Sequence, residues 1–436
     1  MVNRAKNVWL NVSGSLGFVP GLIVIAFGVL GIVMVEIDKD LDLDGASAVF
    51  AGDGPAARTV LSVIAGSLIT VAGLTFSITM VVLQLAASQF SPRILRTFSS
   101  DRLTQVTIGT YVGTFVYAIL VLRAVGSFDD ASFVPRLSVT LASLLGIAAV
   151  VLLVVFLNHV TQLIQVSHVT ASITHETLAR TDALYPEDYG VPAQEEDAED
   201  LLASWRGHPG GRVMARRPGF VQRVGLDDLV AGVAGRAERF AILVRPGDFV
   251  SIETTVIEVW PPEAAEDCRA AFQDAVAVTS ERDLAQDVHF GLRQLTDTAL
   301  KAMSPGINDP MTAVTCIGYL RALLVRVTDR AQPPGVRRFP EHDLTAVLLQ
   351  RRYEEYLELL VQISRYVEGD AWVARELLDA LGACAEVAHR RGAQDRLRSI
   401  RAVAAAIGAR AREEAGGSRD REMIDAAMSR IAHAAG

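Results

Sequence analysis

Four side chains capable of acid–base chemistry or cation binding occur within a short stretch of the C-terminal half of the sequence. They are His289, Asp297, Asn308 and Asp309. Imidazole, carboxylate and carboxamide groups can together transfer protons, and their oxygen atoms can bind a cation. The sequence gives an enzyme little further support, because it contains no serine nucleophile elbow, no phosphate-binding P-loop and no dinucleotide fingerprint. We therefore treat these four residues as a candidate site, assign no catalytic residue, and regard an enzymatic role as the less favoured hypothesis.

No metal ion or cofactor is predicted from the other residues. Two histidines four residues apart on one helix would be typical of a zinc site, as in an H-E-x-x-H motif, and that motif does not occur. The three cysteines form no C-x-x-C pair, which argues against a disulfide framework and favours a reducing compartment. They are Cys268, Cys316 and Cys384. The formal net charge of −9 is opposite in sign to that of a nucleic-acid-binding domain.

A second group of residues lies on one predicted helix in the N-terminal half. Small and polar side chains recur there at intervals that place them on one face of the helix. They are Ser62, Gly66, Thr70, Gly73, Ser77, Gln84 and Ser88, here called the stripe. A stripe of this kind is unsuited to lipid, so two interpretations remain open. Either it packs against another helix, as small residues allow, or it lines a water-filled path through an oligomer, with Gln84 near the cytoplasmic mouth.

The elements that carry these residues divide into a membrane half and a soluble half. Hydrophobic residues make up 50% of the 436 residues, and they are concentrated before about residue 178. A helix of about 20 apolar residues can cross a bilayer, and four stretches satisfy this length. They run over about 16–35, 59–85, 106–125 and 137–157. The fourth continues without proline or glycine, so the sequence predicts one long helix that becomes a cytoplasmic stalk within a region spanning residues 1–178.

Loop charges predict the orientation in the membrane. Arg4 and Lys6 precede the first stretch and Arg93, Arg96 and Arg102 follow the second, whereas the loops after the first and third stretches are acidic. Loops rich in lysine and arginine remain in the cytoplasm. Both termini, and with them the candidate site, are therefore predicted to be cytoplasmic in a multi-pass protein of the bacterial inner membrane.

The soluble half is predicted to contain a linker, a β module and a helical domain. The linker at 179–209 is rich in proline and acidic residues, which bury little apolar surface. Alternating apolar residues predict strands in a small β module at 210–262, and a helical cytoplasmic domain follows at 263–436. The helices predicted in that domain run over about 264–279 and 283–301 and begin near Asp343, Asp370 and Arg419. The fold class is thus a mainly α membrane protein.

Asp309 also has a purely structural explanation. Pro305-Gly306 would end one helix, Asp309 is suited to the N-cap of the next, and Pro310 is suited to its first turn. A helix–turn–helix joint would therefore account for this segment without any ligand.

Within the β module, Gly219-Phe220-Val221 and Gly247-Asp248-Phe249 are similar to one half of a biotinyl or lipoyl barrel. The attachment lysine is missing. The resemblance therefore implies a small barrel-like β module and no carrier function.

Two longer motifs resemble a known family. One runs from Gly73-Leu74-Thr75-Phe76-Ser77-Ile78 to Gln89-Phe90-Ser91-Pro92-Arg93, and the other comprises His289-Phe290-Gly291-Leu292, Asp297 and the segment from Ser304 to Ala313. Both are similar to a family of bacterial predicted integral membrane proteins classed as a domain of unknown function. The resemblance implies a four-helix membrane region with a cytoplasmic part. It implies no reaction, substrate or catalytic residue.

The function that these features favour is an oligomeric channel or channel-like transporter with a cytoplasmic regulatory domain. Four helices are few for a monomeric transporter, and no inverted repeat relates the helix pairs, whereas an oligomeric pore needs only one lining helix from each subunit. The expected partners are the lipid bilayer, further copies of the chain and an ion or small solute. The alternative is a membrane-anchored scaffold or sensor without transport activity, which would bind a soluble protein partner.

Overall fold

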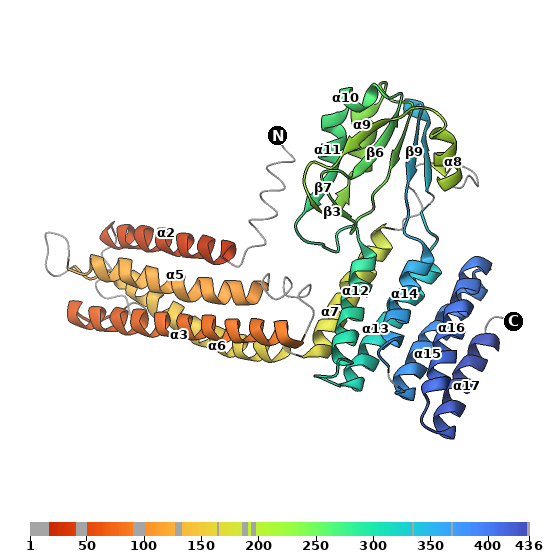
Figure 1. Ribbon diagram of the computed structural model, residues 1–436. Coiled ribbons are helices and arrows are strands. Elements are labelled where there is room, and N and C mark those ends of the chain that lie inside the picture. The colour runs from red at the N-terminus through yellow and green to blue at the C-terminus, as the bar shows by residue number, and fades with distance from the viewer. Residues whose placement is uncertain are drawn as a thin grey trace. The chain divides into compact units, whose positions relative to one another are not determined.

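The computed structural model describes residues 17–40, 50–89, 101–126, 133–163, 165–184, 191–192, 198–333, 335–367 and 369–433. The chain divides into two compact units, Met1–His168 and Val169–Gly436. Most of the described residues are helical, and a smaller number form strands (Figure 1). We describe each unit by itself.

The first unit contains four long helices. They are α2 (Phe18–Asp40), α3 (Gly54–Gln89), α5 (Arg102–Ala124) and α6 (Arg136–Leu163), and they lie side by side in Figure 1. Each helix overlaps one of the four predicted apolar stretches over most of its length and extends beyond it at one end or at both. The outward surface is apolar, with Ile25, Ile147 and Val154 each more than 60% exposed. Such a surface is unsuited to water and is typical of a helix bundle surrounded by lipid.

Helix α5 is packed closely against α2 through glycines. A Cβ atom added at Gly109 would lie 2.9 Å from the Cα atom of Pro20, and one added at Gly113 would lie 3.0 Å from Cγ of Phe27. The two glycines are four residues apart, as in the G-x-x-x-G pattern that allows membrane helices to approach closely. We call Gly109 and Gly113 the α5 seam. The seam makes α5 a central element of the bundle.

Asp38 connects the end of α2 to the beginning of α6. The sequence placed Asp38 in an acidic loop, but it lies in the last turn of α2 and is 8% exposed. Its carboxylate accepts hydrogen bonds from the backbone N–H groups of Leu137 and Ser138, both at 2.9 Å. These donors belong to the first turn of α6 and have no partner within that helix, so a carboxylate from another helix stabilises them.

The predicted continuous stalk is interrupted. Helix α6 ends at Leu163, and a separate helix, α7 (Val166–Leu184), follows. The backbone N–H of Gln165 donates to the carbonyl of Gln162 at 3.1 Å, which is a tight turn of the kind that closes a helix. The hydroxyl of Thr161 bonds the carbonyl of Asn158 at 2.7 Å. The helix therefore ends although the sequence contains no proline or glycine at this point.

The second unit contains two sheets. The strands are β1 (Val191–Pro192), β2 (Gly211–Met214), β3 (Gly219–Val224), β4 (Arg239–Ile242), β5 (Phe249–Val250), β6 (Thr255–Trp260), β7 (Val276–Thr279), β8 (Val336–Phe339) and β9 (Leu344–Leu348). The larger sheet has the order β1-β8-β9-β4-β6-β2, and the smaller has the order β5-β3-β7. Strands β4 and β9 are parallel neighbours, whereas the other strand pairs are antiparallel.

The helices of this unit pack around the sheets and continue as a helical array (Figure 1). They are α8 (Ala198–Trp205), α9 (Leu226–Val233), α10 (Ala264–Asp267), α11 (Arg269–Ala275), α12 (Val288–Ala302), α13 (Pro310–Asp329), α14 (Tyr353–Ser364), α15 (Ala371–Arg390), α16 (Gln394–Glu414) and α17 (Ser418–His433). The side chain of Asp370 accepts from Trp372 and Val373 and caps α15, in agreement with the predicted start of that helix.

Three predictions for the second unit differ from the structure. The single helix expected at 264–279 is instead the two short helices α10 and α11, and α11 ends at Ala275 because Val276–Thr279 pairs with β3 as strand β7. The helix expected from Asp343 is strand β9, which pairs with β4. Helix α8 lies inside the segment expected to be a linker. The strands at 276–348 therefore extend the β region beyond 210–262, and the C-terminal region is not entirely helical.

Five of the described helices are long and apolar enough to cross a membrane. Four of them are α2, α3, α5 and α6 of the first unit, and the fifth is α13 of the second unit. These five helices are selected by length and composition alone. Only the first four coincide with stretches that the sequence predicted to span the membrane.

Candidate functional site

The stripe on α3 lies on the surface of the first unit. Ser62, Gly66, Thr70, Gly73, Ser77 and Gln84 are all exposed, and the side chain of Ser88 lies outside the described residues. The buried side of the same helix carries Leu61, Ala65, Leu68 and Ala72, which pack against the rest of the bundle. The stripe therefore faces away from the other described helices of the first unit.

The glycines of the stripe have open space beside them. A Cβ atom added at Gly66 or at Gly73 would meet no atom within 4 Å. The hydroxyl of Thr70 donates to the carbonyl of Gly66 at 2.8 Å, so its hydrogen bond is made within α3. Packing within the described part of this chain consequently does not account for the small residues of the stripe.

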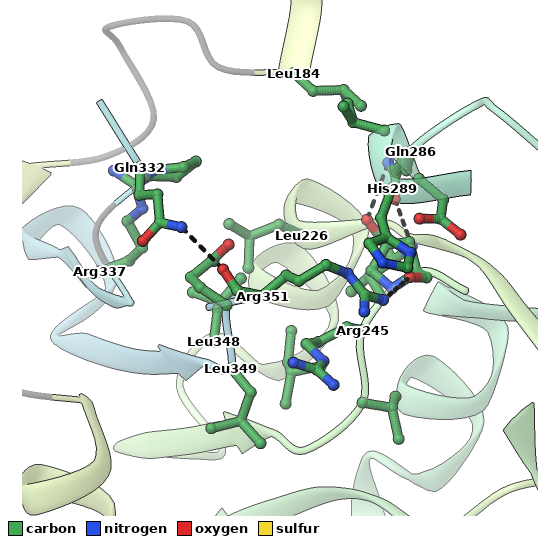
Figure 2. A pocket seen from close by; sticks show the side chains of 18 of the residues that line it. Leu184, Leu226, Arg245, Gln286, His289, Gln332, Arg337, Leu348, Leu349 and Arg351 are labelled. Atoms are coloured by element: carbon green, nitrogen blue, oxygen red, sulfur yellow. Dashed lines mark hydrogen bonds between the residues drawn. The ribbon is translucent and has the colours of Figure 1, made fainter. Parts of the chain in front are cut away.

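A second candidate site lies in the other unit, where strands β4 and β9 end. A cavity of about 200 Å³ opens there, and Figure 2 shows the side chains around it. Because β4 and β9 are parallel, their carboxyl ends meet at one edge of the sheet, which is where open sheets with helices commonly bind ligands. The residues that follow the two strands, Arg245 and Arg351, project into this region.

Two arginines and two carboxylates form a closed ring at the cavity. Arg245 contacts Asp248 at 3.3 Å and Glu355 at 2.7 Å. Arg351 contacts the same two residues, Asp248 at 3.7 Å and Glu355 at 2.9 Å. Each carboxylate thus bridges both guanidinium groups. The ring holds two cations side by side and fixes their orientation, and Arg351 is only 14% exposed.

A buried ion pair between Arg282 and Asp287 lies against the turn that carries Asp248. Arg282 donates to the carboxylate of Asp287 at 3.0 Å, and Asp287 also caps α12 by accepting from the backbone N–H of Phe290. Gly247 packs directly on this pair, with φ of +90°, and a Cβ atom there would lie 2.1 Å from Oδ2 of Asp287. The turn Pro246-Gly247-Asp248 therefore requires glycine for the close approach as well as for its backbone conformation.

His289 lies in the first turn of α12 and lines the cavity beside Arg351 (Figure 2). Its Nδ1 atom is buried and has no hydrogen-bond partner among the described residues. Burial, followed by the positive charges of Arg351, Arg282 and Arg293, lowers the pKa of the imidazole to about 3. His289 is consequently neutral at pH 7. It also contacts the ring of Tyr356 edge-on, with 5.6 Å between the ring centres.

The structure does not bring the four residues of the predicted site together. His289 is in the first turn of α12, Asp297 is in the middle and pairs with Arg293 at 2.8 Å, and Asn308 and Asp309 follow the other end. A helix of this length spans about 20 Å, at 1.5 Å per residue. Only His289 therefore lies at the cavity.

Asp309 is the N-cap of α13. Its carboxylate accepts from the backbone N–H of Thr312 at 3.1 Å and from the hydroxyl of Thr312 at 2.6 Å. These hydrogen bonds lower the pKa of Asp309. Asn308 has a positive φ of 48° and donates its backbone N–H to the carbonyl of Ser304. The segment from Ser304 to Asp309 is therefore a hydrogen-bonded turn between α12 and α13, as its proline and glycine indicate.

Neither Arg245 nor Arg351 was predicted from the sequence as a candidate site residue. The only signal was the Arg245-Pro246-Gly247-Asp248 turn, and Arg351 stands in no motif. The described residues include no group of three or more His, Cys, Asp or Glu side chains arranged to hold a metal ion.

Comparison with known proteins gives a family and several relatives. A family model described as "Predicted membrane protein (DUF2254)" matches residues 13–383. An uncharacterized protein of Mycobacterium bovis is 32% identical over 398 residues, which are 88% of this chain and 74% of that protein. An uncharacterized protein of Mycobacterium tuberculosis strain H37Rv shows the same identity over the same shares of the two chains. No solved structure matches this chain.

Proposed function

This chain belongs to the DUF2254 family of predicted membrane proteins, and from this premise we propose that it is an oligomeric channel or channel-like transporter with a cytoplasmic regulatory domain. The observation that carries the proposal is the exposed stripe on α3. Membrane association itself follows from the family and from the apolar helices.

We propose that α2, α3, α5 and α6 are the spanning helices. Helix α13 meets the same criteria of length and composition, but its apolar side chains pack against α12 and α15 within the second unit. Cys316, Leu320 and Leu324 of α13 are fully buried there. A helix whose apolar face is already covered has no need of lipid.

The orientation remains the one that the loop charges favour. Arginine and lysine are concentrated before the first spanning helix and after the second, so both termini are in the cytoplasm in this proposal. The second unit, which carries the arginine-lined cavity, is then cytoplasmic and in a position to regulate the membrane part.

The stripe supports an oligomeric path for three reasons. It lies on the side of α3 opposite to the buried side, and Ser77 and Gln84 offer polar groups that hydrocarbon does not satisfy. The open space beside Gly66 and Gly73 leaves room for another helix or for water. In a ring of identical subunits, one such helix from each chain would be enough to line a pore.

The second candidate function is a scaffold or sensor without transport. In that case Gly66 and Gly73 allow α3 helices of neighbouring copies to approach closely, and no water enters between them. The cytoplasmic unit would then bind a soluble protein. Unchanged liposome permeability together with a soluble protein that co-purifies would favour this function.

The test is ion flux from liposomes that contain the purified protein. Gln84→Leu should lower the flux, because an apolar side chain in a narrow path expels water. Asn158→Leu is the matched control, since Asn158 is an exposed polar residue near the equivalent end of α6 and lies outside the stripe. Size-exclusion chromatography would establish that both variants assemble normally.

Either outcome of the flux measurement decides between the two functions. Flux that Gln84→Leu lowers and Asn158→Leu leaves unchanged would support the channel. Absence of flux from the wild-type protein at varied pH, voltage and calcium concentration would reject the channel in favour of the scaffold. If the two substitutions changed the flux equally, the flux would not depend on the stripe.

A further inference from the structure

We propose that one end of the helical array in the second unit docks on the surface of the lipid bilayer. The contact is made by Ile307, Met311, Tyr366 and Trp372, which we call the apolar end. The inference rests on the proposed spanning of the membrane by α6, but it does not depend on channel activity. It comes from the exposure of these side chains, from the packing that brings them together and from the short connection between α6 and α7.

The apolar end leaves large hydrophobic side chains uncovered. Ile307 is 45% exposed, Met311 is 54% exposed, and Tyr366 and Trp372 are each 52% exposed. Among the described residues of the second unit, these are four of the six large hydrophobic residues that are exposed, and the other two lie on and beside β5. Single exposed apolar residues are common on soluble proteins, but a group of this kind marks a contact surface.

The packing of α12 against α14 brings the four residues to one end of the array. His289 near the start of α12 contacts Tyr356 near the start of α14, with 5.6 Å between the ring centres. One turn later, Arg293 of α12 bonds to Gln362 of α14. The two helices are therefore parallel, and their final turns lie side by side. The turns that follow them, α12–α13 and α14–α15, carry the apolar end away from the sheets (Figure 1).

Helix α7 lies along α12 and begins at the same end. A Cβ atom added at Gly291, near the start of α12, would collide with the side chain of Thr177 of α7. From this contact α7 extends back by eleven residues to Val166, and α12 extends forward by eleven residues to Ala302. Because the two helices lie side by side in opposite directions, the first residue of α7 is level with the α12–α13 turn (Figure 1).

Two ion pairs at the other end of α7 give the same alignment. Asp182 in the last turn of α7 contacts Arg326 at 2.7 Å and Arg330 at 2.8 Å, and both arginines lie at the end of α13. Helices α7 and α13 are similar in length, with 19 and 20 residues. Their starts are therefore also level, so Met311 in the first turn of α13 lies beside the start of α7.

The chain keeps this end close to the bilayer. The apolar stretch of α6 ends near residue 157, α6 itself ends at Leu163, and α7 begins at Val166. Nine residues of helix span about 14 Å. The headgroup region extends about 5–8 Å beyond the hydrocarbon on each side. The start of α7, and the apolar end beside it, therefore remain within reach of the headgroups in whatever direction α7 leaves α6.

The two turns hold their exposed side chains in place. The backbone N–H of Ile307 donates to the carbonyl of Ser304 at 3.0 Å, and the backbone N–H of Trp372 donates to the carboxylate of Asp370 at 3.0 Å. Groups that are already ordered lose little conformational freedom when they bind. The turns therefore present their apolar side chains for contact at low entropic cost.

The residue types favour lipid as the partner. Tryptophan and tyrosine are enriched where a bilayer meets water, because each combines an apolar ring with a polar group. The carboxylates at this end, Asp309 and Asp370, are used as caps of α13 and α15. Burial of apolar surface thus drives the contact, and a zwitterionic lipid is sufficient. A second copy of the chain would cover the same side chains but would not explain their position beside the start of α7.

The experiment attaches a fluorescent label at one position at a time to the full-length protein in phosphatidylcholine nanodiscs. The natural cysteines Cys268, Cys316 and Cys384 are all buried, so a thiol-reactive label should attach to an introduced cysteine. Two quenchers are compared, a nitroxide near the glycerol end of the lipid acyl chain and iodide in the water. Thermal melting would show that each labelled variant is folded.

Four labelled variants separate the possible results. Met311→Cys and Trp372→Cys report on the apolar end. Gln394→Cys is the matched control, because Gln394 is exposed and follows the opposite end of α15, about 30 Å away along that helix. Val154→Cys reports on whether α6 lies in lipid, since Val154 is 65% exposed on that helix.

The lipid nitroxide should quench the labels at Met311 and Trp372 by about half or more, because interfacial residues lie within about 5–10 Å of the boundary between headgroups and acyl chains. The label at Val154 should be quenched as well. The label at Gln394 should be quenched little by the lipid and strongly by iodide.

A double substitution tests the chemistry of the contact. In protein labelled through Met311→Cys, Ile307→Ser together with Tyr366→Ser should lower the lipid quenching about twofold or more, because less apolar surface is buried in lipid. Unchanged quenching would overturn the apolar contact. If Met311→Cys does not fold, a label on Tyr366→Cys takes its place, with Ile307→Ser as the accompanying substitution.

The docking is overturned if the labels at Met311 and Trp372 are open to iodide and are quenched by lipid no more than the label at Gln394. Shielding from iodide without quenching by lipid would also overturn it, in favour of a second copy of the chain at this surface. Absence of quenching at Val154 would overturn the spanning of α6 and this inference with it. Quenching at Val154 alone would overturn the docking and leave the spanning unaffected.

Discussion

The α5 seam and the α3 stripe consist of similar residues in similar patterns, but their surroundings differ. Gly109 and Gly113 of the seam lie against Pro20 and Phe27 of α2, where an added methyl group would collide. A Cβ atom added at Gly66 or Gly73 of the stripe would have no other atom within 4 Å. Small residues at helical spacing therefore indicate that something approaches closely, but they do not indicate whether the partner belongs to the same chain. The seam serves the packing of two helices of one chain, whereas the stripe is exposed among the described residues of the first unit.

The largest effect is expected from Gly109→Val in the seam. The added side chain meets the backbone of Pro20 at 2.9 Å, and a backbone atom cannot move aside as a flexible side chain can. We expect a loss of stability of about 1–3 kcal/mol, as for overpacked cores. Thermal unfolding in detergent would measure it, with Gly66→Val on the stripe as the control. Equal destabilisation by both substitutions would remove the distinction between seam and stripe.

The next largest effect is expected at Asp38, which connects the last turn of α2 to the first turn of α6. Asp38→Ala leaves the backbone N–H groups of Leu137 and Ser138 without their carboxylate. Loss of a helix cap costs about 0.5–2 kcal/mol. Asp40→Ala, which removes an exposed carboxylate two residues away, is the control, and it should leave the melting temperature unchanged. A stable Asp38→Ala protein would show that α6 does not need this cap.

A change in assembly without a change in fold is expected from the stripe. The double substitution Gly66→Leu and Gly73→Leu fills open space on α3, so the melting temperature of the chain should change little. If neighbouring copies meet at this face, the bulky side chains should reduce the oligomer fraction in chemical cross-linking. Persistence of the wild-type oligomer would exclude the stripe as the contact between copies.

The smallest effect compares two threonines on opposite sides of α3. Thr75 is buried and its hydroxyl has no partner among the described residues, whereas Thr70 is exposed and bonds the carbonyl of Gly66. Thr75→Val should raise stability by up to about 1 kcal/mol, because it removes a buried polar group that lacks a hydrogen bond. Thr70→Val should have almost no effect. Destabilisation by Thr75→Val would reveal a bound partner of that hydroxyl, such as water.

Sequence patterns predicted the local features of this molecule well. The four apolar stretches coincide with α2, α3, α5 and α6 to within a few residues at the ends, and Asp309 and Asp370 cap α13 and α15. These features depend on apolar length, capping residues and glycine or proline, which are all visible in a short segment. The break between α6 and α7 was missed because no proline or glycine marks it in the sequence.

Features that depend on distant partners were not predictable in this way. Strand β9 was taken for the start of a helix, since its apolar residues become a strand only by pairing with β4. The same pairing brings Arg351 beside Arg245, so the candidate cavity shares this dependence. Likewise, no pattern on α3 could show that the described residues of the first unit leave the stripe exposed.

The parallel pairing of β4 and β9 has a consequence for synthesis of the chain. Strand β4 leaves the ribosome about a hundred residues before β9, because α12 and α13 lie between them in the sequence. By then the hydrophobic helices of the first unit have already emerged, while β4 still presents an open edge that could pair with other chains. A truncated product that stops before Leu344 would retain this open edge. The ribosome must therefore complete most of the second unit before the sheet can close and the arginine-lined cavity can form.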